Sequence, residues 1–407
     1  MSSKNTFCIL PWIHLFASTT GTLRPCCVSK EFEHRYKIHK EGIKEYWNSE
    51  HVRKLRQAML NGERPDICFT CWDKEANGDT HSKRLGELAN WQKRFNIDEL
   101  INSTAADGSV EDNIVSYDLR LGNLCNLKCV MCNPNSSSKW LEDTAILDKY
   151  KNTGFSHHSL PNLKWPELDE LWNYLEENGN KLRMLQFAGG EPLLHKKHYR
   201  LLEQLVEKGY SKNIFIKYNT NITKLPNKVF ELWNEFKRVD LWCSLDGLDE
   251  LNDYIRFPSK WQDMVDSLNI LDNTTEHINI RVNTAVSALN IEYIPEFYNY
   301  IAHSNFKKIG KASWYDGVHI APDIVYDPDH LNMRVLPKYA KEKITHKIKS
   351  HLETVENTQY KEQMNYVLTY MNSEDWSSNY DQLIRYVTEL DNIRGNKYPY
   401  ELYSTNK

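Results

Sequence analysis

Nine cysteines are the residues of this 407-residue chain whose type and grouping most directly indicate chemistry. Eight of them lie in the first third of the chain in tight groups, and residues 133–407 contain only Cys243. Packing gives no reason to segregate a small hydrophobic residue in this way, whereas ligation of a metal or a cluster does. Because the count is odd and the chain looks intracellular, a disulfide framework is not expected.

The segment 120–132, RLGNLCNLKCVMC, spaces three cysteines as C-x3-C-x2-C. They are Cys125, Cys129 and Cys132. Three thiolates on one loop can hold three irons of a [4Fe–4S] cluster and leave the fourth iron open to another ligand. Zinc is the alternative, but a structural zinc normally takes four protein ligands, and the fourth would have to come from elsewhere.

This loop resembles the signature of the radical SAM superfamily, with Met131 in place of the apolar residue before the last cysteine. The resemblance implies that the three cysteines bind a [4Fe–4S] cluster and that S-adenosylmethionine (SAM) chelates its open iron. It further implies reductive cleavage of SAM to a 5′-deoxyadenosyl radical, which abstracts a hydrogen atom from a substrate C–H bond.

Strand and helix patterns alternate from residue 115 to about 325, which is typical of parallel β/α units. Strands are predicted at 115–121, 184–188, 213–219, 238–245, 278–285 and 317–321. Helical patterns lie between them at 137–151, 196–208, 226–236, 260–272 and 291–303. Six such units fit the partial (β/α)6, TIM-like barrel that the resemblance implies.

Several of the predicted strands carry one polar face. The strand at 278–285 alternates apolar residues with Asn279, Arg281 and Asn283. A closed TIM barrel fills its interior with branched apolar side chains, so a repeated polar face indicates a wet lumen that houses ligands. Exposed sheet edges are the alternative. Cys243 has the opposite parity to Ser244 and is expected in the core, facing the helices.

The segment 187–194, FAGGEPLL, follows the second predicted strand, and its adjacent glycines let backbone approach a ligand closely. It resembles the family's GGE motif, which implies that Gly189, Gly190 and Glu191 bind the amino group of the SAM methionine. By the same resemblance, further SAM contacts are expected from Met131, Asn219, Ser244, Arg281 and the backbone of Ile320. For Arg281, an inward-facing structural arginine is the alternative.

Two weaker signals accompany these motifs. His195 and His198 follow the GGE turn at i, i+3 spacing and could form a metal pair, although a solvated helix face is the favoured interpretation. The segment 314–319, WYDGVH, is a candidate substrate wall at the sixth strand. An ordinary turn before a strand is the alternative there.

A second set of cysteines lies within the first hundred or so residues. Its members are Cys8, Cys26 or Cys27, Cys68 and Cys71. The TTGT sequence at 19–22 is typical of a hairpin turn, which would bring Cys8 close to Cys26. The stretch 41–60 has the apolar spacing of one helix that carries the chain toward Cys68.

This N-terminal module resembles the twitch/SPASM auxiliary-cluster domain of radical SAM enzymes in its C-x-x-P-W, G-x4-C and C-x-x-C-W segments. The resemblance implies one auxiliary [4Fe–4S] cluster, with Cys26 favoured over Cys27 because Gly21 and Cys26 match the G-x4-C spacing. Such a domain usually follows the barrel, whereas here it comes first, as in N-terminal twitch proteins. A zinc ribbon-like site is the alternative.

Composition describes a globular chain with a net charge of −4 and 12% aromatic residues, which argues against disorder and against a basic field for nucleic acid. The longest apolar stretch, at 7–17, is too short to span a membrane. No secretion signal is recognisable, so a cytoplasmic location is expected. The predicted divisions are an auxiliary-cluster domain at 1–101, a linker at 102–113, a radical SAM core at 114–335 and an extension with two amphipathic helices at 336–407.

The leading hypothesis is a radical SAM enzyme with one auxiliary cluster that modifies a peptide or protein. Its expected partners are SAM, that substrate and an electron donor such as flavodoxin or ferredoxin, with no membrane and no nucleic acid. A sugar, nucleotide or other small molecule is the alternative substrate. A non-catalytic iron–sulfur or zinc-binding protein is the second hypothesis, and a sulfur-inserting or methylating enzyme is the third.

Overall fold

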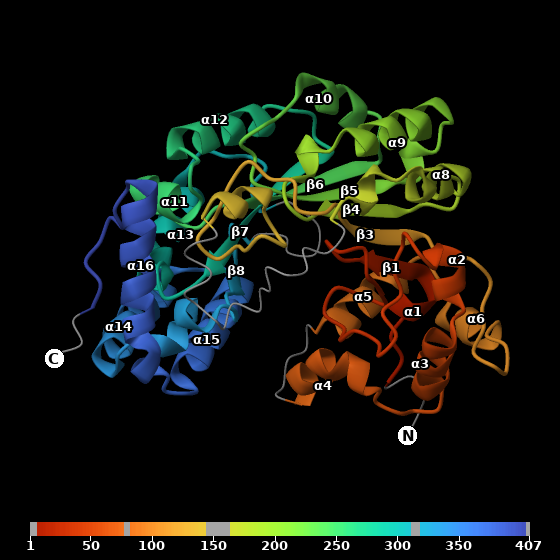
Figure 1. Cartoon of the computed structure of the whole chain (residues 1–407), viewed down its shortest axis with the longest axis horizontal. Helices are drawn as coiled ribbons and strands as arrows, with labels where there is room; N and C mark the ends of the chain where they lie inside the picture. The colour runs from red at the N-terminus through yellow and green to blue at the C-terminus, as the bar shows by residue number, and fades with distance from the viewer. Residues whose placement is uncertain (1–5, 77–81, 144–162, 311–317, 404–407) are drawn as a thin grey trace. The chain divides into compact units, whose positions relative to one another are not determined.

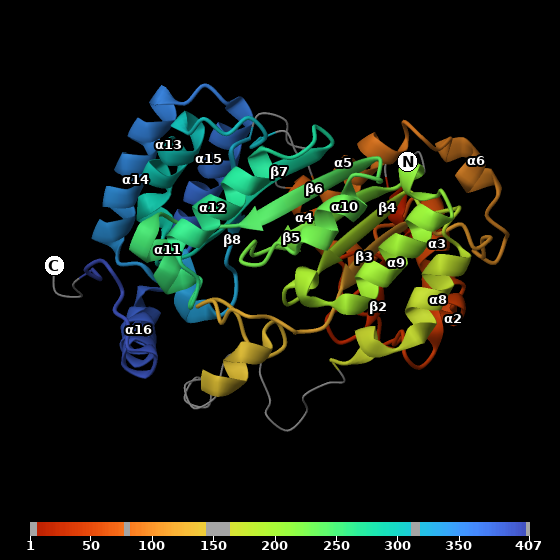
Figure 2. The same ribbon diagram turned by 90° about the horizontal axis from the view of Figure 1, so that it is seen from above.

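The computed structural model describes residues 6–76, 82–143, 163–310 and 318–403. The chain divides into two compact units, each of which is described by itself (Figures 1 and 2). The first unit comprises Met1–Gly122, Leu160–Lys217 and Glu235–Lys237. The second comprises Asn123–Ser159, Tyr218–Asn234 and Arg238–Lys407.

The first unit is built on a sheet with the strand order β2-β1-β3-β4-β5. Its strands are β1 (His14–Ala17), β2 (Leu23–Arg24), β3 (Ser116–Arg120), β4 (Met184–Ala188) and β5 (Phe215–Thr220), the last of which continues into the second unit. β1 pairs with β2 in an antiparallel hairpin and with β3 in parallel, and β3 pairs in parallel with β4. The N-terminal segment therefore adds two strands to a parallel sheet.

Helices cover both faces of this sheet. They are α1 (Leu10–Ile13), α2 (Gly42–Trp47), α3 (Glu50–Leu60), α4 (Phe69–Ala76), α5 (Lys83–Trp91), α6 (Ile97–Asn102), α8 (Asp169–Glu177) and α9 (Lys196–Glu207). In Figure 1, α8 and α9 lie on one side of β3 and β4, and α1, α3 and α5 lie on the side of β1 away from them. The buried residues Phe7, Trp12 and Ile13 pack with Met59 of α3 and Trp91 of α5, so residues 7–13 are part of the core.

The second unit has the parallel strand order β6-β7-β8. These strands are β6 (Arg238–Ser244), β7 (Ile278–Val286) and β8 (Ile320–Ile324). Its helices are α10 (Asn227–Trp233), α11 (Asp249–Ile255), α12 (Trp261–Asp272), α13 (Ile294–His303), α14 (Lys338–Thr354), α15 (Thr358–Asn372) and α16 (Tyr380–Arg394). α14 and α15 lie side by side in both views.

The predicted α/β class and the partial barrel are confirmed. All six predicted strands are present, the sixth shifted to 320–324, and β2 and β8 are open edges rather than partners in a closed barrel. The sequence did not predict that β1 and β2 join the sheet, because four buried residues, His14–Ala17, show no alternation to detect.

Three helix predictions are corrected by the structure. The helix expected over 41–60 is two helices, since Ser49 has an extended backbone and begins α3. The described part of the helix expected at 137–151 is a 3-10 helix, Ser138–Asp143, and the remainder lies outside the described residues. The C-terminal extension has three long helices rather than two, because α15 was not recognised.

The predicted solvated histidine face is also wrong. His195 and His198 are both buried, and the Nδ1 atom of His198 lies 2.6 Å from the carbonyl oxygen of His195. The His198 ring packs against Phe187, with 5.2 Å between ring centroids. Within the part of the chain that the structure describes, no helix is long and apolar enough to cross a membrane.

Candidate functional site

The three closely spaced cysteines of the second unit lie on a loop that has no regular secondary structure over residues 121–137. Two backbone hydrogen bonds fix this loop to the end of α11. Lys128 N donates to Phe257 O, and Val130 N donates to Ile255 O, both at 2.8 Å. These two bonds bracket Cys129 on one side and Arg256 on the other, so the two residues are held opposite one another.

The three thiols of this loop differ in their surroundings. Cys129 is buried at 5% exposure, whereas Cys125 and Cys132 are half-buried. Leu127 N donates to Cys125 Sγ at 3.4 Å, and Asn221 Nδ2 lies 3.9 Å from the same sulfur. Two donors therefore already point at Cys125, as expected of a site that stabilises a thiolate.

A buried ion pair, Arg256 with Asp246, faces the sulfur of Cys129. Arg256 Nη1 lies 3.9 Å from Cys129 Sγ, and Arg256 Nε lies 2.5 Å from Asp246 Oδ2. A hydrogen bond from Cys132 and the Arg256 charge outweigh the effect of burial and lower the pKa of Cys129 to about 7. The same hydrogen bond, together with burial, raises the pKa of Cys132. The loop thus favours one thiolate even before any metal binds.

The C-terminal helix α16 braces the cysteine loop from a position some 250 residues away in sequence. The Tyr386 hydroxyl donates to Val130 O at 2.8 Å, and Arg394 Nε lies 3.0 Å from Asp143 Oδ2. Asp143 also pairs with Lys128 at 2.7 Å. These contacts are buried, so the loop is held in one conformation by the helix that follows the barrel strands in sequence.

The GGE turn belongs to the first unit. Gly189 and Gly190 both have positive φ, at 81° and 51°, a conformation that favours glycine. A Cβ atom on Gly189 would lie 2.8 Å from the carbonyl carbon of Arg120, so this position has no room for a side chain. Glu191 is fully buried, and its Oε1 accepts a hydrogen bond from Leu193 N at 3.1 Å.

The other residues predicted to contact SAM all lie in the second unit. They are Met131 in the cysteine loop, Asn219 in β5, Ser244 at the end of β6, Arg281 in β7 and Ile320 at the start of β8. Met131, Asn219 and Ser244 are half-buried, and the Arg281 guanidinium lies over the Trp242 ring at 4.4 Å. Trp242 and Arg281 are register partners, as are Ser244 and Asn283, so the polar residues of β6 and β7 form one row. Their roles toward SAM stay predictions.

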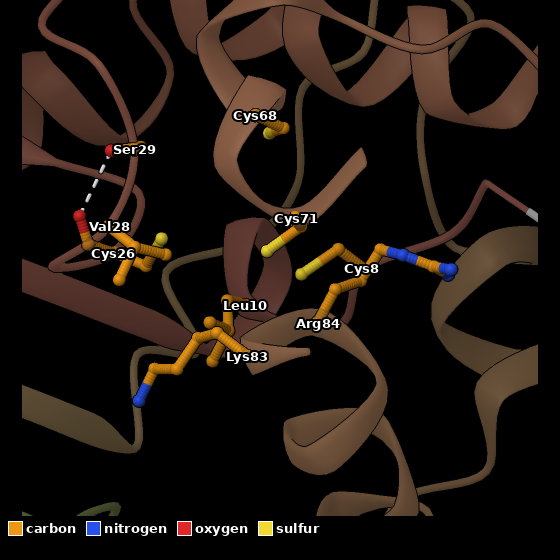
Figure 3. Close-up of a pocket in the computed structure, with 9 residues that line it drawn as sticks. All are labelled: Cys8, Leu10, Cys26, Val28, Ser29, Cys68, Cys71, Lys83 and Arg84. Carbon is orange, nitrogen blue, oxygen red and sulfur yellow. Dashed lines mark hydrogen bonds between the residues drawn. The ribbon is translucent and has the colours of Figure 1, made fainter. Parts of the chain in front are cut away.

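The second cysteine group lines one cavity within the first unit (Figure 3). Cys8 precedes α1, Cys26 follows β2, Cys68 ends a short 3-10 helix and Cys71 lies in α4. The sulfurs of Cys8 and Cys71 point toward one another, while the Lys83 amine points away from them. Among the described residues, no three histidine, cysteine or acidic side chains lie as close together as a single metal ion requires.

Cys27 does not line this cavity. Its thiol is instead hydrogen-bonded to the Arg120 side chain, and its carbonyl accepts a hydrogen bond from Arg24 at 3.3 Å. Cys26 is held by its own carbonyl, to which Ser29 Oγ donates at 2.9 Å. The geometry therefore directs Cys26 toward the other three thiols and Cys27 away from them.

The cavity thiols are costly to ionise without a metal. Burial raises the pKa of Cys8, Cys68 and Cys71, and it raises the pKa of Cys26 to about 12, with Cys27 adding to the shift. A metal or cluster would replace the four protons and balance the thiolate charge. Four thiols from three segments are the complete protein donor set of a [4Fe–4S] cluster, so the residues fit such a group.

Sequence reasoning missed the residues that surround the cysteine loop. Arg256 and Arg394 carry no spacing signal toward the cysteine loop, because their proximity depends on tertiary pairing. Asp246, two residues after Ser244, is not among the predicted SAM contacts. Trp314, Tyr315 and Asp316 of the predicted substrate wall lie outside the described residues.

Two family models match this chain. The radical SAM superfamily model matches residues 119–301, and the SPASM model, an iron–sulfur cluster-binding domain, matches residues 8–72. These matches confirm the predicted resemblance to the radical SAM superfamily over residues 119–301 and to a SPASM iron–sulfur domain over residues 8–72.

Individual relatives are more distant. A 200-residue segment is 28% identical to the uncharacterized protein MJ0907 of Methanocaldococcus jannaschii, covering 47% of this chain and 59% of that protein. Among solved structures, anSMEcpe with bound AdoMet shares 18% identity and a TM-score of 0.39, over 70% of this chain and 63% of that one.

The Streptococcus suis SuiB structure with S-adenosylmethionine shares 14% identity and a TM-score of 0.36, over 76% of this chain and 64% of that one. The match thus spans less than two thirds of the length of each of these relatives. The TM-scores are low, and the family assignment rests on the two sequence models.

Proposed function

We propose that this chain cleaves SAM reductively and abstracts a hydrogen atom from a substrate C–H bond. The observation that supports it is the loop that carries Cys125, Cys129 and Cys132 within the region matched by the superfamily model. A [4Fe–4S] cluster bound there would supply the electron that cleaves SAM and generates the hydrogen-abstracting radical. Three protein thiolates leave one iron for the amino and carboxylate groups of SAM.

Different residues of the chain would contact different groups of SAM. The Gly189–Gly190 backbone admits the methionine group closely, and the Glu191 carboxylate pairs with its ammonium. Arg281 offers a charge complementary to the carboxylate. Further contacts come from the side chains and backbone at the strand ends: Met131, Asn219, Ser244 and Ile320.

The second cysteine group would hold one auxiliary cluster through Cys8, Cys26, Cys68 and Cys71. Four thiolates occupy every iron, so this cluster has no open position for substrate. Its work is then to hold the fold or to pass an electron, rather than to bind the reacting group. The burial of Cys26, in contrast to the half-exposed Cys27, supports the choice between these adjacent residues.

For the substrate we propose a peptide or protein, on the SPASM match at residues 8–72. A flavodoxin or ferredoxin is the proposed electron donor, and the cytoplasm the proposed location. We retain the domain boundaries 1–101, 102–113, 114–335 and 336–407 as part of this proposal. The 102–113 segment is packed, since Arg56 and Gln57 of α3 donate to Gly108 O and Ala106 O.

The test is the formation of 5′-deoxyadenosine by anaerobically reconstituted protein after addition of SAM and dithionite, measured by mass spectrometry. Cys129→Ala should abolish the product, and the matched control Cys243→Ala, a buried cysteine in β6, should retain it. The proposal is supported if the wild type and the Cys243→Ala variant form 5′-deoxyadenosine and the Cys129→Ala variant does not.

A fully iron-loaded wild type that yields no product, with or without added peptides, contradicts it. Transfer of deuterium from a labelled peptide into 5′-deoxyadenosine would identify a peptide substrate. If the substrate is a sugar or a nucleotide, the labelled peptide should transfer no deuterium. Sulfur insertion would consume the auxiliary cluster, and methylation would leave S-adenosylhomocysteine, so the same spectra distinguish both.

A further inference from the structure

The environment of Cys129 is unlike that of its two neighbours. Asn221, from another segment, places its neutral amide Nδ2 atom 3.9 Å from Cys125 Sγ. Cys129 instead faces the guanidinium of Arg256, at the same 3.9 Å distance. A full positive charge therefore stands beside Cys129, and the same charge also acts on Cys132.

This charge cannot easily move away. The bonds Lys128 N to Phe257 O and Val130 N to Ile255 O lock the backbone on both sides of the Cys129–Arg256 pair. The Arg256 side chain is 13% exposed, and its Nε lies 2.5 Å from Asp246, which is fully buried. Asp246 is fixed in turn, because its Oδ1 accepts a hydrogen bond from Ala285 N at 2.7 Å and its N donates to Asn252 Oδ1 at 3.0 Å.

We infer that Arg256 is a positioning residue whose fixed charge makes the cluster held by Cys129 easier to reduce, and that Asp246 limits this effect. The inference rests on the proposed function, in that a [4Fe–4S] cluster is bound by this loop. Reduction from [4Fe–4S]2+ to [4Fe–4S]+ adds one electron, supplied by a low-potential donor such as dithionite. A cation beside the ligand sulfur stabilises that added negative charge, and a carboxylate opposes it.

The experiment is a redox titration of reconstituted protein followed by electron paramagnetic resonance, using the signal that changes when SAM is added. Arg256→Gln should reduce the ratio of reduced to oxidised cluster about tenfold at a fixed potential, a midpoint lower by about 59 mV for one electron. Arg256→Lys keeps the charge and should shift the ratio by less than about threefold. Asp246→Asn removes the opposing charge and should raise the midpoint.

Arg334→Gln is the matched control, because Arg334 is 15% exposed and pairs with Glu374, away from any cysteine in the described structure. It should leave the midpoint unchanged. If Arg256 had only a structural role, its variants would lose iron or thermal stability. Their midpoint potentials would then not follow the charge of the residue at position 256.

An Arg256→Gln protein that holds its cluster at the wild-type midpoint overturns the inference, and so does an Arg256→Lys protein with a midpoint as low as that of the Gln variant. If the Gln variant holds no iron, the other two decide: an unshifted Asp246→Asn midpoint then overturns the inference. The proposed function fails separately, when the wild type carries iron but forms no 5′-deoxyadenosine. Midpoints remain measurable in that case.

Discussion

The two cysteine groups of this chain differ in how they are built. The four thiols of the cavity come from three segments around α1, β2 and α4, and three of the thiols are buried. The three thiols of the loop come from eight consecutive residues, and two of them are half-buried. The cavity is thus formed by folding of the whole N-terminal region, whereas the loop carries its three thiols locally and is held by contacts from other segments.

The charges around the two groups differ as well. Burial raises the pKa of every cavity thiol, whereas a hydrogen bond from Cys132 and the charge of Arg256 lower the pKa of Cys129 to about 7. The protonated thiols of the apolar cavity can ionise at low cost only when a metal binds. Metal binding and folding of this region are therefore coupled. A loop with a ready thiolate can bind metal in a fold that already exists.

The largest expected effect is the loss of a cavity ligand. Cys71→Ala should remove about four irons per chain and markedly lower the melting temperature, because the remaining buried thiols can no longer complete a cluster. Cys27→Ala is the matched control, since Cys27 contacts Arg120 outside the cavity and its loss should leave the iron content unchanged. Iron analysis and thermal unfolding under anaerobic conditions measure both.

Equal iron content in the Cys71 variant and wild type would show that the cavity holds no cluster. A Cys27 variant with the larger iron loss would instead make Cys27 the ligand. Either result would remove the contrast between a closed cavity and an open loop.

A smaller effect is expected from buried arginines that brace each site. Arg84 lines the cavity and forms a bidentate pair with Glu75, while Arg394 pairs with Asp143 beside the loop. Replacing Arg84 with Met removes the bidentate partner of Glu75, which costs about 3–5 kcal/mol. Replacing Arg394 with Met should cost less, because Asp143 keeps its ion pair with Lys128. Lys54→Met, which breaks an exposed pair with Glu50, should cost less than about 1 kcal/mol.

Hydrogen exchange locates the two losses. Arg84→Met should loosen residues around Cys8 and Cys71, and Arg394→Met should loosen residues around Cys129. A uniform loosening from both variants would argue that the two sites unfold as one cooperative unit and not as two.

The site was predictable where its chemistry is local in sequence. C-x3-C-x2-C, the GGE turn and the C-x-x-C pair each place candidate site residues within a few positions of one another, so the sequence alone groups them. Arg256 was not predictable, because its distance from Cys129 depends on a backbone pairing between segments about 127 residues apart. The position of β1 in the sheet was not predicted for a similar reason. Its pairing with β3 depends on tertiary structure, and its four residues are all buried, so they show no alternating pattern.

Acid should weaken both units through buried histidines. Burial, followed by the nearby charge of Lys83, lowers the pKa of His14 in the first unit to about 4, and burial lowers the pKa of His330 in the second unit to about 4. In the unfolded chain these histidines protonate near pH 6.5. Below that pH the unfolded state therefore binds more protons than the folded state. Stability is complete above about pH 6.5 and falls by about 1.4 kcal/mol per pH unit for each such histidine down to about pH 4.

Urea unfolding of the apoprotein between about pH 7 and pH 4.5 measures this slope, with His14→Gln and His330→Gln each removing one contribution. If the units unfold separately, each variant should flatten the slope of only one transition. A slope that neither variant changes would assign the acid sensitivity to other groups.

The smallest expected effect tests how α16 holds the cysteine loop. Tyr386→Phe deletes the hydroxyl that donates to Val130 O at 2.8 Å and should cost about 1 kcal/mol in unfolding free energy, because a buried carbonyl loses its donor. Tyr360→Phe is the control, since the buried Tyr360 hydroxyl has no hydrogen-bond partner among the described residues, and its removal should cost nothing measurable. Tyr386→Phe should also speed amide exchange at Cys129 to Cys132 while leaving the N-terminal cavity as slow as in wild type. Faster exchange at Cys8 and Cys71 in that variant would mean that the cavity depends on α16 as much as the loop does, and the two sites would then share one support.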